Sequence, residues 1–284
     1  MKTQINSDLS DYEIHEWGVL AGCQKEDKYF CTSRPLVAVY VREPVIYVHS
    51  RDKKAFSLRV IFRDGKPTDT YPPAEVHGNS LSWTNVQFSP KGGPSNGLRR
   101  EEYKPLKDII KLLNDVDADE LQYGELATRF LFYEGEMRYD NKIRVEHNLT
   151  GKKATVKNTG KVTVYDVLVV VPQGEGGSSS TIDVFYARVA KLGGGESVTA
   201  ELLPWKEDFS FVPQLVGQGF TRKEATSFDK LWKKPFFQPP NETEWSHLIY
   251  RLSEEACENV TELSFTPKPK KCVRALYVLV RSVA

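Results

Sequence analysis

Apolar and polar residues alternate along most of the chain, and this pattern predicts a mainly β protein. Successive side chains of a strand point to opposite faces, so alternation is typical of a sheet with one face in the core. No period of 20–50 residues repeats, so neither a solenoid nor a propeller is expected. In the first half, the pattern marks strands at residues 12–20, Leu36–Arg42, Pro44–Ser50, Ala55–Arg63, Leu81–Phe88 and Phe130–Tyr133.

Helical spacing stands out in two segments. The first is expected at about residues 105–114, where Pro105 lies near the start and apolar residues recur on one face. The second begins at a capping box, Thr221-Arg222-Lys223-Glu224, in which each end satisfies a free backbone donor of the first turn. We expect Pro235 and Pro239-Pro240 to end this helix. Later strands are expected at His247–Leu252, Thr261–Thr266 and Val273–Val280, and the last is apolar enough to be central.

Three segments follow from this layout. Residues 1–142 are expected to form a β-rich domain with one inserted helix. In residues 143–204, strands separated by an Asn-Thr-Gly turn predict an immunoglobulin-like β-sandwich module. Residues 205–284 mix helix and strand, an α+β character, and are expected to pack back on the β domains. The predicted fold class is therefore mainly β, with β-sandwich domains and a few helices.

Composition and charge exclude several classes of function. The chain has 284 residues, of which 40% are hydrophobic and 27% charged, which is typical of a globular protein rather than a disordered one. Its formal net charge of +1 gives no field that would attract nucleic acid or an anionic membrane. No apolar run approaches the ~20 residues of a membrane helix. The N-terminus lacks the core of a signal peptide, so we expect a cytoplasmic protein or, alternatively, a mature secreted form.

Four cysteines leave two alternatives open. Cys23 and Cys31 bracket a polar loop, and Cys257 and Cys272 bracket a strand-sized segment, so each pair is a candidate for a local disulfide. The other interpretation is four free thiols. No Cys-x-x-Cys pair occurs, which argues against a zinc ribbon.

Histidines near the N-terminus are the candidates for metal binding. His15, His49 and His77 each lie on or beside a predicted strand of one sheet region, with Glu75 close by in sequence. Two or three imidazoles and a carboxylate can hold zinc or iron and leave a position for water. A divalent metal, zinc in particular, is therefore a possible cofactor. The alternative for His15 is a buried histidine bonded to the backbone, and for His77 a histidine on a surface loop.

Two carboxylates are candidates for catalysis. Glu16 and Glu134 together would suit the acid pair of a glycosidase, although their separation is unknown and a charged strand end is the favoured explanation of Glu134. His15 and Glu16 are expected on opposite faces of their strand. Trp17 and Tyr133 are candidates for binding, since aromatic side chains on a sheet can contact a ligand.

Several landmarks resemble an uncharacterised protein family of archaea and of bacteria such as planctomycetes. The most distinctive are His15-Glu16-Trp17-Gly18 and Phe130-Leu131-Phe132-Tyr133. The resemblance implies a co-linear layout and no known activity. The Cys23/Cys31 loop departs from the family pattern, and so does the stretch before Phe130, which lacks a His/Tyr-rich segment. If that segment supplies a ligand in relatives, this chain does not share their metal site.

Two hypotheses of function remain, and whether the protein is an enzyme is left open. The first is a binding or assembly module, favoured by the sandwich content and the lack of a strong catalytic motif. It predicts an exposed aromatic or apolar patch and a protein partner or homo-oligomer. The second is a metal-assisted hydrolase that uses histidines of the N-terminal domain.

Overall fold

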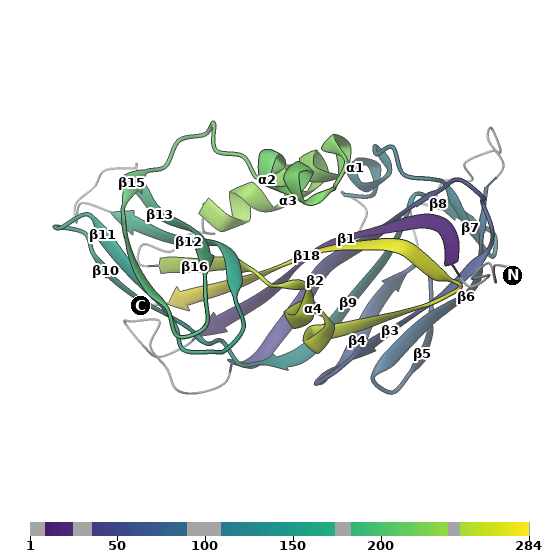
Figure 1. The fold of residues 1–284 in the computed structure, drawn as a ribbon, viewed down its shortest axis with the longest axis horizontal. Coiled ribbons are helices and arrows are strands. Elements are labelled where there is room, and N and C mark those ends of the chain that lie inside the picture. The colour runs from purple at the N-terminus through teal and green to yellow at the C-terminus, as the bar shows by residue number, and fades with distance from the viewer. Residues whose placement is uncertain (1–8, 25–35, 90–108, 174–182, 238–244, 284) are drawn as a thin grey trace, which may run out of the picture.

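A nine-stranded sheet forms the centre of the protein in the computed structural model, which describes residues 9–24, 36–89, 109–173, 183–237 and 245–283 (Figure 1). Its strands are β1 (Leu9–Gln24), β2 (Leu36–Ser50), β4 (Gly65–Tyr71), β9 (Phe130–Tyr139), β12 (Val164–Gln173), β13 (Asp183–Leu192), β15 (Leu203–Pro204), β16 (Trp245–Arg251) and β18 (Lys268–Val283). Their order is β15-β13-β12-β16-β18-β1-β2-β9-β4. The sheet is mainly antiparallel, but β1 and β18 pair in parallel.

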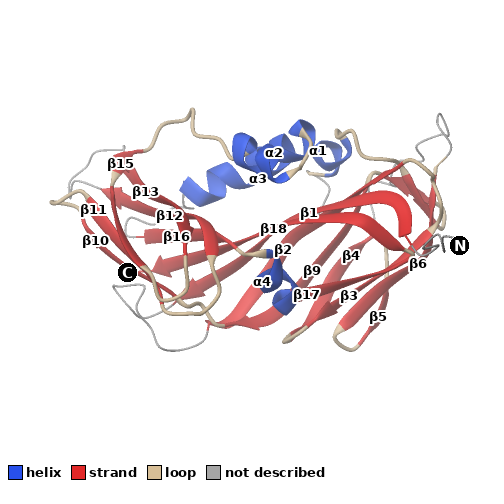
Figure 2. Ribbon diagram, viewed as in Figure 1, coloured by secondary structure: helices blue, strands red, loops and turns tan. Residues whose placement is uncertain are grey.

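Two smaller sheets accompany the central one. One has six strands: β3 (Phe56–Phe62), β5 (Glu75–His77), β6 (Ser80–Phe88), β7 (Leu121–Tyr123), β8 (Leu126–Thr128) and β17 (Thr261–Thr266). The other has three: β10 (Ile143–Asn148), β11 (Lys153–Asn158) and β14 (Ser197–Glu201). The mainly β fold class is thereby confirmed (Figure 2).

The two faces of the central sheet bury different partners. On one face, Ile14, Ile46 and Leu131 belong to a core cluster that also takes in Trp83 of the six-stranded sheet and Val156 of the three-stranded sheet. The opposite face carries a second cluster of buried side chains, and some of these side chains come from the helices. Alternation along β1 therefore decides which of two separate cores each side chain enters.

Helices cover that second face. They are α1 (Ile110–Asn114), α2 (Val212–Gln218) and α3 (Arg222–Phe237), which lie together above the central strands in Figure 1. Phe228 of α3 packs edge-on against Trp17 of β1, at 5.6 Å between ring centroids. A fourth helix, α4 (Glu254–Val260), contributes Cys257 and Val260 to the other core. Among the described residues, no helix is long and apolar enough to cross a membrane.

The capping box predicted at the start of α3 is confirmed. The Thr221 N–H donates to Glu224 Oε2 at 2.8 Å, and the Glu224 N–H donates to Thr221 Oγ1 at 3.3 Å. The expected end at Pro235 is wrong, because α3 continues to Phe237. A proline in the last turn removes a single intrahelical hydrogen bond there, which is a small loss at a helix end. The start of the helix predicted at about 105–114 lies outside the described residues, and α1 occupies its end.

Strand predictions agree with the structure along most of the chain, and β18 is central as expected, between β1 and β16. The two strands predicted at Leu36–Arg42 and Pro44–Ser50 are one strand, β2, with an irregular register between Val41 and Val45 against β9. Gly18 of β1 lies opposite this irregularity: a Cβ added there would meet Pro44 Cα at 2.8 Å. The glycine of His15-Glu16-Trp17-Gly18 thus allows a proline in a central strand.

The nine-stranded sheet draws strands from all three predicted segments, 1–142, 143–204 and 205–284. Within residues 143–204, β10, β11 and β14 form the three-stranded sheet, whereas β12, β13 and β15 extend the central one. The immunoglobulin-like character of this segment and the division into three domains stay predictions.

Candidate functional site

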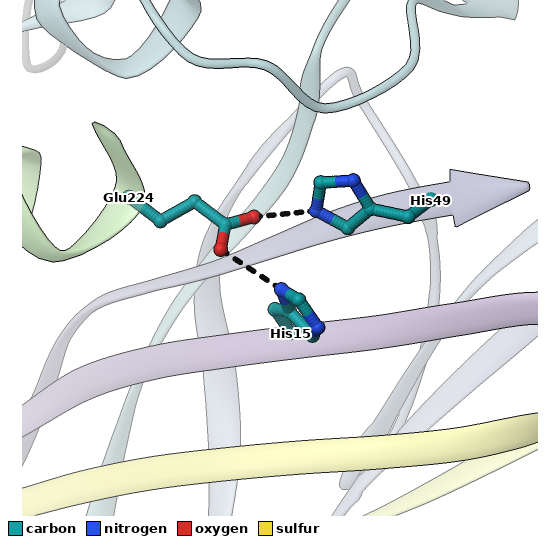
Figure 3. A group of neighbouring side chains, drawn as sticks. All are labelled: His15, His49 and Glu224. Carbon is teal, nitrogen blue, oxygen red and sulfur yellow. Dashed lines mark hydrogen bonds and ion pairs between the residues drawn. The ribbon is translucent and has the colours of Figure 1, made fainter. Parts of the chain in front are cut away.

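Three chemically capable side chains meet where helix α3 contacts strands β1 and β2 (Figure 3). Glu13 of β1 is registered with His49 of β2, so His15, two residues along, is a diagonal neighbour of His49 on the same face. The centroids of the two imidazole rings lie 4.6 Å apart. Glu224, the N3 residue of the α3 capping box, reaches down from the helix to both of them.

Glu224 bridges the two histidines with its two oxygens. His15 Nδ1 lies 2.8 Å from Glu224 Oε2, and His49 Nε2 lies 2.7 Å from Glu224 Oε1. Oε2 also accepts the Thr221 N–H, so the carboxylate makes three hydrogen bonds while its side chain is 0% exposed. A carboxylate can be buried this deeply only because its oxygens are bonded.

The charge states follow from these contacts. Burial alone would raise the pKa of Glu224, but the hydrogen bonds from His15 and His49 outweigh it and lower the pKa to about 2. Burial likewise lowers the pKa of His49, yet its hydrogen bond to the Glu224 carboxylate and that charge raise the pKa above its usual value. Because an ionised carboxylate only accepts hydrogen bonds, the ring nitrogens that face it carry hydrogens. His15 is therefore protonated at Nδ1.

The second ring nitrogen of His15 has no such partner. His15 Nε2 is buried and makes no hydrogen bond, and its nearest charged group is Glu13 Oε2 at 4.0 Å. Glu13 and His49, the neighbours of His15, line an open pocket of about 340 Å³. The pocket is lined by Asp11, Glu13, His49, Ser50, Arg51, Asp119 and Lys270. Glu13 and His49 thus connect the buried cluster to solvent.

A second buried polar network lies on the opposite face of β1. Arg274 of β18 donates to Glu16 Oε2 at 2.5 Å and to Thr261 at 2.8 and 2.9 Å. The Tyr133 hydroxyl donates to Glu16 Oε1 at 2.6 Å, and Glu258 accepts from Arg274 at 2.7 Å. Glu16 is 0% exposed and both of its oxygens are bonded, so it is committed to holding β1, β9 and β18 together.

The structure brings together only part of the histidine group predicted from sequence. His15 and His49 meet, but His77 and Glu75 lie exposed on β5, which pairs with β6 of the six-stranded sheet. The expectation that the three histidines share one sheet is therefore wrong for His77. Since β5 is short and exposed, a surface position for His77 agrees with the alternative interpretation.

The remaining candidates are also placed. Tyr133 contacts Glu16, so the next residue of β9, Glu134, points to the other face of the sheet. Glu16 and Glu134 therefore cannot flank one glycosidic bond, which corrects the acid pair considered from sequence. Trp17 and Tyr133, the aromatic candidates for binding, are both fully buried.

Glu224 is the residue that the sequence did not reveal as part of a site. Its hydrogen bond to His15 spans 209 positions of the chain. The capping box did mark it as the N3 carboxylate of a helix, but a cap is usually exposed. Its position after Phe220, which is buried against the sheet beside His15, was the available signal that this cap faces inward.

Of the two alternatives left open for Cys257 and Cys272, the structure has the free thiols and no disulfide between them. Cys257 is buried in α4, and Cys272 is partly buried on β18. Burial raises the pKa of the Cys257 thiol to about 11 and that of Cys272 to about 12, so both thiols are protonated and unreactive at neutral pH. The Cys23–Cys31 pairing lies outside the described residues.

Comparisons with known proteins give no family. No family model and no curated protein matches the chain. Among solved structures, the yeast delta-COP-I mu-homology domain aligns over 96% of both chains with 7% identity and a TM-score of 0.35. The same domain complexed with a Dsl1 WxWxV peptide aligns over 96% of both chains with 7% identity and a TM-score of 0.34. Superpositions this loose carry no argument about function, and the resemblance to an archaeal and planctomycete family stays a prediction.

Proposed function

We propose that this chain is a binding module that recognises, in the pocket beside His49, a ligand or partner segment with charges of both signs. The observation that carries the proposal is the lining of the pocket, in which every residue is charged or polar. A pocket with such a lining offers oriented charges and hydrogen bonds to a ligand.

Charges of both signs are available to a ligand there. Glu13 has a side chain that is 40% exposed, and among the described residues its ion-pair partner is His15, at the long distance of 4.0 Å. Lys270 pairs loosely with Asp11 at 3.7 Å, and its side chain is 60% exposed. Arg51 adds a second cation. A ligand with one ammonium and one carboxylate group can therefore face Glu13 and Lys270 together.

The described residues offer no apolar docking surface. Their exposed large hydrophobic residues are Val76, Leu203 and Val216, which lie on β5, β15 and α2. The aromatic or apolar patch expected of an assembly module is therefore absent from the described parts of the chain. The outer strands of the central sheet also disfavour strand addition, since β4 contains Pro67 and β15 has 2 residues.

Nuclear magnetic resonance with capped peptides tests this proposal. The dipeptide acetyl-Lys-Glu-amide should cause saturable shifts at the amides of Glu13 and Ser50, with a Kd on the order of 1 mM, since few polar contacts form. Acetyl-Lys-amide and acetyl-Glu-amide should bind several-fold more weakly. Glu13→Gln should weaken the dipeptide, whereas Glu75→Gln, which changes another exposed strand carboxylate, should not. Absence of saturable shifts with all three probes would refute the proposal.

A metal-assisted hydrolase is the second candidate. It is favoured by the two imidazoles and one carboxylate beside the pocket, a ligand set that holds zinc and leaves a position open. Zinc-loaded protein should then cleave an activated ester such as p-nitrophenyl acetate, and His49→Gln should abolish the zinc-dependent rate. Equal rates with and without zinc would eliminate this candidate.

A further inference from the structure

We infer that His15, His49 and Glu224 bind one divalent transition-metal ion, preferentially zinc, through His15 Nδ1, His49 Nε2 and one oxygen of Glu224. The inference stands on the geometry of the three side chains and goes beyond the proposed function, because it requires no ligand in the pocket. Glu224 is the third ligand of this proposed site, in place of His77 and Glu75, which the sequence suggested as ligands.

Distances within the cluster fit one ion. All three ligand atoms lie within 4.8 Å of one another. Ligand atoms on a tetrahedral zinc ion are about 3.3 Å apart, given bonds of about 2.0–2.2 Å. The nitrogen–oxygen pairs now hydrogen-bonded at 2.7 and 2.8 Å would therefore separate by roughly half an ångström. Since one oxygen suffices for the ion, Oε2 can keep the Thr221 N–H while Oε1 turns to the metal.

Metal binding requires the two imidazoles to exchange tautomers. Each neutral ring donates the hydrogen of the nitrogen that faces Glu224, so this hydrogen must leave when the nitrogen binds metal. It reappears on the other nitrogen of the same ring, at His15 Nε2 and His49 Nδ1, and a ring that starts neutral releases no net proton. The exchange is local and leaves both rings neutral, as metal ligands must be.

The second nitrogen of His15 supports the metal-bound form. In the hydrogen-bonded cluster, His15 Nε2 is a buried acceptor without a donor. After tautomer exchange it becomes a donor, and the Glu13 carboxylate lies 4.0 Å away in the direction of the pocket. Histidine ligands of metals usually donate their other N–H to a carboxylate or carbonyl oxygen, which fixes the ring. Metal would thus turn this atom into a donor, and the Glu13 side chain, which is 40% exposed, has to move about 1 Å closer to accept from it.

The surroundings of the cluster also suit a bound cation that keeps one coordination position open. His49 is the most accessible of the three, with a side chain that is 24% exposed, and it lines the pocket. Asp11, Glu13 and Asp119 add negative charge to the pocket walls, where the cations Arg51 and Lys270 offset part of it. The ion can therefore enter from the pocket, past His49.

Isothermal titration with zinc chloride tests the inference on untagged protein that has been dialysed against chelator. The wild type should bind about one equivalent, and His49→Gln should weaken binding at least about tenfold. His77→Gln, which removes an exposed histidine from β5, should bind as the wild type does. Glu13→Gln should weaken binding by about tenfold, as loss of a group that supports a ligand does. No binding by the wild type, or equal binding by His49→Gln, would overturn the inference.

A second measurement keeps the test valid if His49→Gln does not fold. Cobalt(II) added to the wild type should give the intense visible bands of tetrahedral coordination, and zinc should abolish them. Weak bands of octahedral cobalt, as in water, would overturn the inference. Because no peptide is present in either experiment, failure here leaves the proposed pocket function to be judged on its own.

Discussion

His15 and Glu16 are neighbours in the chain, yet each belongs to a buried polar network on a different face of the same sheet. Around Glu16, both carboxylate oxygens are bonded, to Tyr133 and to Arg274. Around His15, one ring nitrogen is bonded to Glu224 and the other has no hydrogen-bond partner. The first network lies inside a core between layers, whereas the second adjoins an open pocket.

This difference separates a structural network from a candidate site. Burial and charge are common to both, so neither identifies function. What distinguishes the His15 network is an unsatisfied atom together with access from solvent, because a ligand can contribute only where the protein has left a group to bind. The Glu16 network is saturated, and we expect its loss to affect stability and not binding.

Arg274→Met should give the largest effect on stability. It leaves the Glu16 carboxylate buried without its cation, a change that typically costs about 3–5 kcal/mol. Chemical denaturation at pH 7 measures this loss in the free energy of unfolding. A loss below about 1 kcal/mol would show that Glu16 is not held as an ion pair, and the distinction between the two networks would fail.

His247 provides a saturated histidine to compare with His15. Its Nδ1–H donates to the Phe236 carbonyl at 2.7 Å, and burial, helped by the charge of Arg281, lowers its pKa from 6.5 to about 4. Below pH 6.5 the unfolded chain takes up a proton that the folded protein does not, so this group destabilises the fold as the pH falls toward 4. The shift corresponds to about 3 kcal/mol.

Unfolding measured between pH 7 and pH 4 checks this effect in wild type and His247→Gln. The variant should show a smaller fall in the free energy of unfolding across this range, whatever its stability at pH 7. Parallel curves would mean that His247 titrates normally in the folded protein.

Glu224→Gln should have an intermediate effect. The amide oxygen can still accept the Thr221 N–H, so the cap of α3 is retained, but the charged hydrogen bonds to both histidines are weakened. Hydrogen bonds to charged groups contribute about 1.5–3 kcal/mol, and we expect a loss of about 2 kcal/mol. Denaturation of Glu136→Gln, which changes a largely exposed carboxylate on β9, is the control and should differ little from wild type.

Glu258→Gln should give the smallest effect. Glu258 bonds to Arg274, but its side chain is 45% exposed, so the pair contributes under about 1 kcal/mol. Arg274 keeps Glu16 and Thr261 in this variant. If thermal unfolding showed a loss of stability as large as that of Arg274→Met, the network would depend on the exposed Glu258 contact instead of the buried contacts of Arg274.

Sequence patterns predicted the local structure better than the site. Alternation located the long strands, and the capping box placed the start of α3, because both depend on residues close in the chain. The same local patterns correctly placed His15 and Glu16 on opposite faces. They could not show that β1 and β18 pair in parallel at the centre, which depends on residues some 259 positions apart.

The site itself depends on a long-range contact. His15 and His49 were recognised as candidates because they lie on strands near the N-terminus. Glu224 was assigned only a capping role, since nothing local indicates that the N-terminus of α3 rests on the sheet above them. His77 was grouped with them because it is close in sequence, although it lies on a different sheet.

The tautomer of His15 tests the central claim most directly, that its network is built to take a ligand. Long-range ¹H–¹⁵N spectra of histidine-labelled protein report which ring nitrogen carries the hydrogen. Without metal, His15 should be protonated at Nδ1, and one equivalent of zinc should move the hydrogen to Nε2 while His247 stays unchanged. A His15 signal that zinc does not alter would contradict the account and place His15 with Glu16 among the purely structural groups.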